Sequence, residues 1–221
     1  VEATSHGLSK RTARLEDVQF TSGVFTNISH EHLEFHGTFD QYLHDKSRLF
    51  RKLDEAAAAE TAAGNSPGPG SFGVVNAADP AAEYMRSVTS RPVYGYLLEG
   101  AGGGPHGPAD LAGRVTEETA EDLALIIRTG EGSARGELPM PGAFNAENAL
   151  AAVLTVSRLI DADPLELVPY LSRLLPVPGR MTPVKAGQPF AVIVDYAHTP
   201  GSFSRLFPLM RERTPGKLVA V

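Results

Sequence analysis

The stretch GVFTNISHEHLEFHGTFDQYLHDKSRLF, residues 23–50, decides the fold class of this chain. It opens with a short apolar run at 23–27 that ends on polar residues, the pattern of a buried strand. It closes with a helical pattern for which Thr38 is the expected N-cap. The inward positions of that helix are expected to be Tyr42, Leu43, Lys46, Leu49, Phe50 and Leu53.

Apolar runs at 72–76, 92–98 and 123–129 also indicate buried strands. Alternation of such strands with helices predicts an α/β fold, in which a mostly parallel sheet is covered by helices on both faces. The Gly-rich segment 99–110 is predicted to be a flexible connection, because no Lys-Ser/Thr pair follows its glycines. Residues 55–71 run from an alanine-rich helix into a Pro/Gly loop.

The last third of the chain contains a second change of pattern. The expected elements are a helix at 145–161 capped by Asn145, a helix from Asp163-Pro164, a Pro/Gly hinge at 176–181, a strand at 190–200, a helix at about 201–213 and a final strand. Because a new βαβ unit begins after the hinge, we predict one domain at 1–179 and the start of a Rossmann-like domain at 180–221.

Composition narrows the function. The 221 residues are 42% hydrophobic and 21% charged, as in a globular protein, and the net charge of −6 argues against binding nucleic acid. Cysteine is absent, which excludes disulfides and thiolate metal sites and favours the cytoplasm. No apolar run approaches the roughly 20 residues that cross a bilayer, so no membrane insertion is expected. The chain lacks an initial Met and ends on an apolar run, which suggests a piece of a longer protein.

The histidines of the opening stretch are candidates for ligand binding. His30, His32 and His36 alternate with acids beyond the end of a strand, where open α/β sheets bind ligands and where a divalent cation would fit. A zinc-dependent hydrolase is an alternative, but its H-E-x-x-H motif is off register, since Glu34 lies midway between His32 and His36. Lys46 shares a helical face with apolar residues, and a buried lysine must be paired, neutral or modified.

The stretch resembles the central-domain signature of the Mur ligases, V-F-T-N-L-x-x-D-H-L-D-x-H-G followed by Tyr, Lys and L-F at fixed spacing. Four further segments match the family in the same order: EATSHGL at 2–8, LPMPGAFNAENALAA at 138–152, VPGRM at 177–181 and VDYAHTP at 194–200. The closest branch is the one that adds the third amino acid to UDP-N-acetylmuramoyl-dipeptide.

The resemblance implies that residues 1–179 are the central ATP-binding domain without its phosphate loop, and that 180–221 begin the C-terminal ligase domain. It implies ATP-dependent amide-bond formation through an acyl phosphate, in peptidoglycan synthesis in the cytoplasm. The implied cofactors are ATP, two Mg²⁺ ions and an N-carboxylated lysine. The implied partners are UDP-MurNAc-dipeptide and a free amino acid.

The resemblance also implies roles for single residues. Glu2 corresponds to the acid that holds a magnesium near the ATP phosphates, and His32 to a ligand of the second magnesium. Lys46 corresponds to the lysine whose carbamate helps to hold that second ion, which would explain a lysine on an inward face. The matched substrate-binding residues are Ser5 and Arg14, and the matched ATP-binding residues are Asn145, Asn148, Arg180 and Asp195.

Several positions depart from the family pattern. Glu31 and Glu34 replace two aspartates, and the segment NAADP at 76–80 lacks one acid. The family's G-T-x-G-K-T/S loop does not occur, so the chain alone is expected to hydrolyse no ATP. Related ligases that add glutamate to folate or make cyanophycin remain alternatives, and a fragment with only a binding or structural role is a third.

Overall fold

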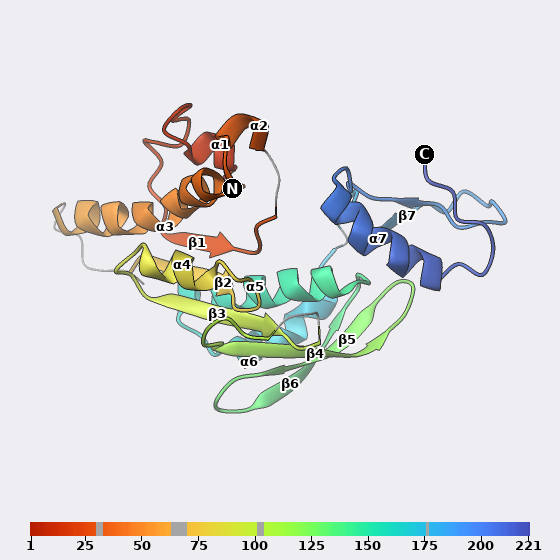
Figure 1. The fold of residues 1–221 in the computed structure, drawn as a ribbon. Coiled ribbons are helices and arrows are strands. Elements are labelled where there is room, and N and C mark those ends of the chain that lie inside the picture. Colours follow the sequence, from red (N-terminus) through yellow and green to blue (C-terminus); the bar gives the residue numbers. More distant parts are fainter. Residues whose placement is uncertain (30–32, 63–69, 101–103, 176) are drawn as a thin grey trace.

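The computed structural model describes residues 1–29, 33–62, 70–100, 104–175 and 177–221 (Figure 1). The elements are α1 (Ser5–Leu8), β1 (Ser22–Phe25), α2 (Leu33–His36), α3 (Phe39–Ala62), β2 (Phe72–Asn76), α4 (Ala82–Ser87), β3 (Val93–Leu98), β4 (Leu111–Glu118), β5 (Leu123–Arg128), β6 (Ser133–Leu138), α5 (Ala143–Ile160), α6 (Pro164–Leu167), η1 (Val168–Arg173), β7 (Thr182–Pro183), β8 (Ile193–Val194) and α7 (Pro200–Glu212). None of the described helices combines the length and apolar character that a membrane span requires.

One six-stranded sheet forms the centre of the molecule, with its strands in chain order from β1 to β6. The pairings β1–β2, β2–β3 and β3–β4 are parallel, whereas β4–β5 and β5–β6 are antiparallel. The predicted α/β fold with a mostly parallel sheet is therefore confirmed. Parallel strands place their carboxyl ends at one edge, so the segments that follow β1 and β2 lie together there.

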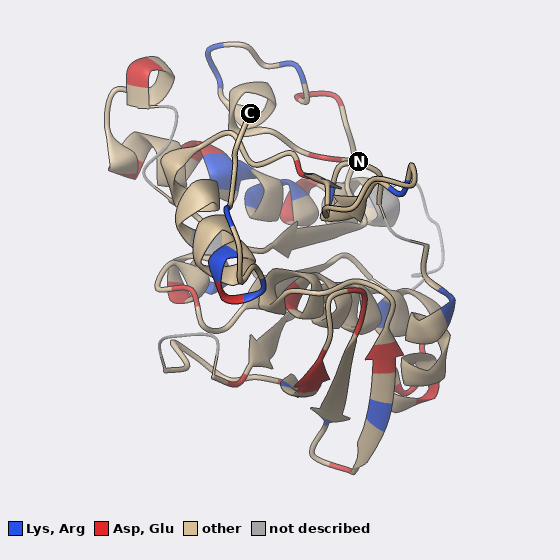
Figure 2. Cartoon of the chain, turned by 90° about the vertical axis from the view of Figure 1, so that its right-hand side faces the viewer, with Lys and Arg blue, Asp and Glu red and all other residues tan. Residues whose placement is uncertain are grey.

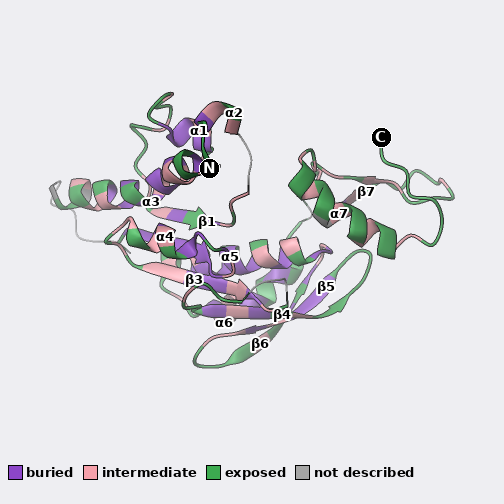
Figure 3. Ribbon diagram, viewed as in Figure 1, coloured by how far each residue is buried: buried purple, intermediate pink, exposed green. Residues whose placement is uncertain are grey.

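One face of the sheet is covered by α5, α6 and η1 (Figure 3). Leu150 and Leu154 of α5 are fully buried in a cluster with Leu125 and Ile127 of β5 and with Tyr96 of β3. At about 25 cal/mol per Å² of apolar surface removed from water, this continuous cluster is the main source of stability.

The opposite face is covered only over its first strands. Phe50 and Leu53 of α3 and Met85 of α4 pack on Val75 there. Further along the same face, Arg114 and Arg135 project from β4 and β6, and their side chains are 59% and 48% exposed. Helices therefore flank both faces at the parallel end, as predicted, while the antiparallel end keeps one face in water.

Strands β4 and β6 were not predicted from the sequence. Their inward positions include Gly113 and Gly136, so the strands lack the apolar alternation that marks a half-buried strand. The glycines have a packing reason. A Cβ on Gly113 would lie 2.9 Å from two atoms of Leu150, and a Cβ on Gly136 would lie 2.9 Å from Val168.

The helix predicted at 145–161 begins earlier, at Ala143. The prediction that Asn145 caps it is wrong, because the N-cap is Gly142, whose φ of 100° disfavours residues with a Cβ. Asn145 lies inside the first turn, and its backbone N–H donates to the carbonyl of Gly142.

Beyond residue 180 the structure has a separate two-stranded sheet of β7 and β8, followed by α7. The strand expected at 190–200 is limited to Ile193–Val194, and the described residues after α7 contain no strand. Apolar side chains beyond this strand pair are exposed to water: Tyr196 is 66% exposed and Val219 75%. The domain boundary near 180 stays a prediction.

Candidate functional site

His36 is the hub of a buried polar chain that joins three helices. It ends α2, and Gly37, with a φ of 80°, turns the backbone into α3. His36 Nδ1 lies 2.8 Å from Asp45 Oδ2, and Nε2 lies 3.1 Å from Ser5 Oγ. Because a carboxylate only accepts, Nδ1–H donates to Asp45, and in the neutral imidazole the Ser5 hydroxyl donates to Nε2.

All three of these hydrogen-bonded residues are buried: Ser5 is 4% exposed, Asp45 5% and His36 7%. The second carboxylate oxygen of Asp45 accepts a hydrogen bond from Gln41 Nε2 at 3.1 Å. Both ring nitrogens of His36 are therefore occupied, which leaves neither of them for the divalent cation or the zinc ion considered from the sequence.

Lys46 lies on α3, beside these three hydrogen-bonded residues. Its Nζ is 5.5 Å from the centre of the Tyr42 ring, and that ring packs against His36 with centroids 5.0 Å apart. Lys46 is half-buried, less so than its inward helical position predicted. The basic residues that α3 buries are Arg48 and Lys52, 8% and 6% exposed.

These two cations hold the segment after α1 against α3. Arg48 donates to the carbonyl of Leu8 and, at 2.6 Å, to Glu16 Oε2, while Lys52 donates to the carbonyl of Glu16. Hydrogen bonding and charge from Arg48 lower the pKa of the Glu16 carboxyl. This pair was not predicted from the sequence, because Arg48 and Lys52 are charged and an inward helical face is marked by apolar residues. Figure 2 shows that residues of both charges are spread over the molecule.

A pocket of about 190 Å³ opens next to His36. Its lining is Ser9, Lys10, Arg11, Phe35, His36, Gln41 and Asp45. Arg11 and Lys10 are exposed, and the Arg11 guanidinium lies 4.9 Å from the centre of the Phe35 ring. The pocket thus has two cations at its surface and the His36–Asp45 pair at its base. A larger hollow of about 310 Å³ is lined by the β4–β5 turn, the start of β5, the second half of β6 and Ser172, and it contains none of the predicted site residues.

The start of α5 carries Asn145 and Asn148. Asn145 is 7% exposed, and its Nδ2 donates to the carbonyl of Pro141 at 2.7 Å. Asn148 is exposed. The backbone N–H of Gly142 donates to Glu118 Oε1 at 2.7 Å, which attaches this end of α5 to the sheet.

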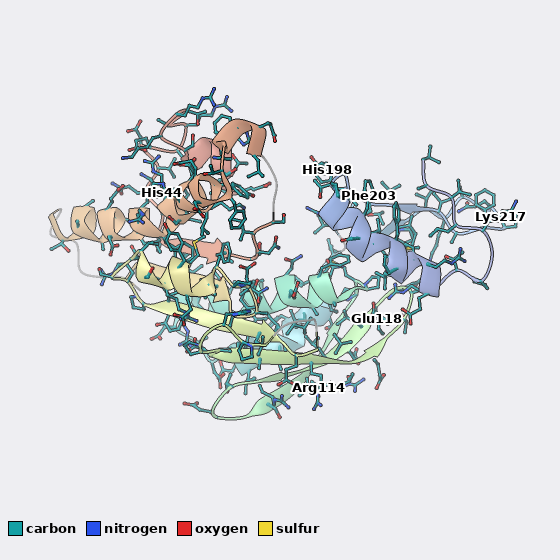
Figure 4. All side chains as sticks on the ribbon, in the orientation of Figure 1. His44, Arg114, Glu118, His198, Phe203 and Lys217 are labelled. Carbon is teal, nitrogen blue, oxygen red and sulfur yellow. The ribbon has the colours of Figure 1, made fainter. Side chains whose placement is uncertain are left out.

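Arg180 and Asp195 come together near β7 and β8. Asp195 accepts hydrogen bonds from the backbone N–H groups of Met181 at 2.9 Å and of Ala197 at 2.8 Å. The Arg180 guanidinium lies 5.6 Å from the centre of the Tyr196 ring. Figure 4 labels His198 and Phe203, which mark the same end of the molecule.

The remaining predicted site residues are Glu2, Arg14 and His32. Glu2 and Arg14 are exposed. His32, with His30, lies outside the described residues, and its role beside Lys46 stays a prediction. Among the described residues, no group of three or more His, Asp or Glu side chains is arranged to hold a metal ion.

Comparison with known proteins agrees with this architecture. The family model of the Mur ligase middle domain matches residues 1–156. The UDP-N-acetylmuramyl-tripeptide synthetase of Treponema denticola is 41% identical over 242 residues, covering 100% of this chain and 41% of the relative. The synthetase of the same name from Roseiflexus sp. is 42% identical over 222 residues, covering 100% and 42%.

A solved structure is also similar. It is a UDP-N-acetylmuramoyl-L-alanyl-D-glutamate–2,6-diaminopimelate ligase, 26% identical with a TM-score of 0.67, covering 95% of this chain and 39% of that one. The chain thus spans about two fifths of the length of the proteins that it matches.

Proposed function

Because the chain belongs to the Mur ligase family, we propose that it is the middle part of an ATP-dependent ligase that adds the third amino acid to UDP-N-acetylmuramoyl-L-alanyl-D-glutamate. The observation that carries this proposal is the 41% identity, over the whole chain, to a tripeptide synthetase. A longer protein would supply the phosphate loop, the uridine-nucleotide site and the selection of the incoming amino acid.

The proposed reaction has two steps. An oxygen of the substrate's terminal carboxylate attacks the γ-phosphorus of ATP, the bond to ADP breaks, and an acyl phosphate forms. The amine nitrogen of the third amino acid then attacks the acyl carbon, loses a proton, and phosphate leaves. Phosphorylation is needed because a carboxylate has no leaving group better than oxide. Catalysis of such transfers depends mainly on positioning and on charge stabilisation.

The proposed metal ligands are Glu2, His32 and carbamylated Lys46. Carboxylate and carbamate oxygens are donors that Mg²⁺ prefers. The position of Lys46 fits this role, because its half-buried amine faces Tyr42 and the His36 cluster on the inward side of α3. Carbamylation would convert that ammonium into an anion. Mg²⁺, when bound, supplies neutralisation of the charge on the transferring phosphoryl group.

Arg14 and Ser5 are the proposed contacts for the muramoyl peptide. Arg14 is exposed, so its guanidinium is free to reach an anionic group of the substrate. Ser5 is buried and bonded to His36, so its contribution would pass through the position of α1.

Asn145, Asn148, Arg180 and Asp195 are the proposed ATP contacts. Asn148 and Arg180 are exposed, and both lie on segments held by defined hydrogen bonds. Asp195 bonds the residue that follows Arg180, so the two would act as one unit.

The test uses the full-length ligase that contains this chain, supplied with ATP, Mg²⁺ and UDP-N-acetylmuramoyl-L-alanyl-D-glutamate. Lysine and diaminopimelate are offered separately, and the tripeptide product is followed by mass spectrometry beside phosphate release. Product and phosphate in equal amounts would support the proposal. Activity only with a folate and glutamate would instead favour the folate-ligase alternative, and ATP-independent, zinc-dependent hydrolysis would overturn the ligase proposal.

A further inference from the structure

Ser5, His36 and Asp45 are the three residue types of a hydrolytic triad, in the same order of hydrogen bonds. A nucleophilic serine must be reachable by a carbonyl carbon. Ser5 is 4% exposed, and the pocket beside His36 is not lined by it. The chain of hydrogen bonds therefore has a use other than nucleophilic catalysis.

The three residues lie on three different elements, α1, α2 and α3. Ser5 begins α1, three residues after Glu2, and His36 ends α2, which directly follows residue 32. Asp45 precedes Lys46 on α3. Both α1 and α2 pack on α3. The helix that follows Glu2 and the helix that carries Lys46 are thus both attached to the His36 ring.

The His36 ring fixes the direction of both of its hydrogen bonds. An imidazole holds its two nitrogens on a rigid ring, so fixing Nδ1 on Asp45 also fixes where Nε2 meets Ser5. Gln41 holds the other oxygen of Asp45 at 3.1 Å, and Tyr42 packs on the ring of His36. Buried polar groups that are all hydrogen-bonded favour one arrangement, because every alternative leaves a group unpaired.

We propose that His36 is a positioning residue for the two proposed metal ions. Through Ser5 it holds the segment that carries Glu2, and through Asp45 it holds the helix that carries Lys46. The inference rests on the proposed function only for the identity of the ligands. Outer partners that orient metal ligands affect metal affinity by about 10- to 100-fold when removed.

The experiment uses the full-length ligase and Mn²⁺ as the probe, with bound metal measured from the loss of the free-ion EPR signal. His36→Phe keeps the ring that packs on Tyr42 and removes both hydrogen bonds. His36→Asn retains an N–H donor for Asp45. The control is His44→Phe. His44 lies on α3 beside Asp45 (Figure 4), its side chain is 44% exposed, and its Nδ1 approaches the Asp45 carboxylate only to 3.9 Å.

We expect His36→Phe to weaken Mn²⁺ binding by about 10- to 100-fold, and His36→Asn to recover part of that loss. The Mg²⁺ concentration for half-maximal activity should rise in parallel. His44→Phe should bind Mn²⁺ like the wild type. If His36→Phe does not fold, Ser5→Ala and Asp45→Asn test the same chain of hydrogen bonds, each with the expected weakening.

Unchanged Mn²⁺ affinity in a folded His36→Phe protein, or in both Ser5→Ala and Asp45→Asn, would overturn the inference. Equal weakening by His44→Phe would do the same, because it would show a general loss of structure. A wild-type protein that binds Mn²⁺ in a His36-dependent way but forms no tripeptide would overturn the proposed function and leave this inference standing.

Discussion

Glu118 Oε1 accepts a hydrogen bond from the backbone N–H of Gly142 at 2.7 Å, which joins the last residue of β4 to the N-cap of α5. The same oxygen is paired with Arg213 at the end of α7. The side chains of Glu118 and Arg213 are 27% and 20% exposed, so this contact is partly shielded from water. A single carboxylate therefore links the sheet, the helix that carries Asn145 and the segment beyond residue 180.

Glu118→Ala should raise the KM for ATP by about 10- to 100-fold, since a lost charge-assisted hydrogen bond costs about 1.5–3 kcal/mol at the site it holds and each 1.4 kcal/mol is about tenfold. The reason is that the first turn of α5, with Asn145 and Asn148, loses its attachment to β4. The control is Glu117→Ala, because Glu117 is adjacent, 68% exposed and paired only at 3.3 Å with Arg135. Steady-state kinetics with varied ATP measure both, and equal KM values for the two variants would contradict the prediction.

Lys46→Ala should nearly abolish turnover in the full-length ligase, because no carbamate can form on alanine. Formate or acetate should restore part of the activity by supplying a carboxylate in the vacated space. Lys185→Ala is the control, since Lys185 is 74% exposed and pairs with Glu121 far from α3. Phosphate release and product formation are measured together. Undiminished turnover in Lys46→Ala would remove Lys46 from the proposed site.

The parallel part of the fold could be predicted because its strands are continuous apolar runs: β2 occupies the expected residues 72–76. In the antiparallel part, β5 matches the expected run at 123–129. Strands β4 and β6 could not be predicted, because Gly113 and Gly136 occupy their inward positions and give no hydrophobic signal. Strands were predicted at 190–200 and at the final apolar run, but only Ile193–Val194 forms one, because a strand also requires a neighbour to pair with. The helix predicted at about 201–213 is confirmed as α7.

The candidate site was partly predictable for a similar reason. The family motifs identified Lys46, Ser5 and the start of α5, which are local patterns in the sequence. The bond between His36 and Asp45 depends on the left-handed turn at Gly37, and the bond to Ser5 spans 31 positions. Neither separation follows a helical or strand period, so only the tertiary structure reveals the hub.

Gly113→Ala should destabilise the protein by about 1–3 kcal/mol, the range for forcing a methyl group into a packed core. The new Cβ would lie 2.9 Å from Leu150, whose side chain is fully buried and has little room to move. Gly130→Ala is the control, because a Cβ there meets no atom within 4 Å. Urea unfolding followed by circular dichroism measures both. An unfolding midpoint of Gly113→Ala equal to that of Gly130→Ala would show that α5 packs less closely on β4 than the 2.9 Å distance implies.

Glu16→Gln should reduce stability at neutral pH and make little difference in acid. Arg48 lowers the pKa of the Glu16 carboxyl below its usual 4.5 by hydrogen bonding and by charge. A carboxyl whose pKa is lower in the folded state stabilises the fold above its unfolded pKa, and the contribution is lost as pH falls through the folded value. The Glu16 side chain is 52% exposed, so water and salt weaken the interaction and the effect should be small.

Glu131→Gln, which removes the same charge from the exposed turn between β5 and β6, is the control for Glu16→Gln. Urea midpoints measured from about pH 7 to about pH 3 should show a wild-type advantage over Glu16→Gln that shrinks as the carboxylate protonates, and none over Glu131→Gln. An advantage that is constant across this range would mean that the Glu16 charge does not contribute through Arg48.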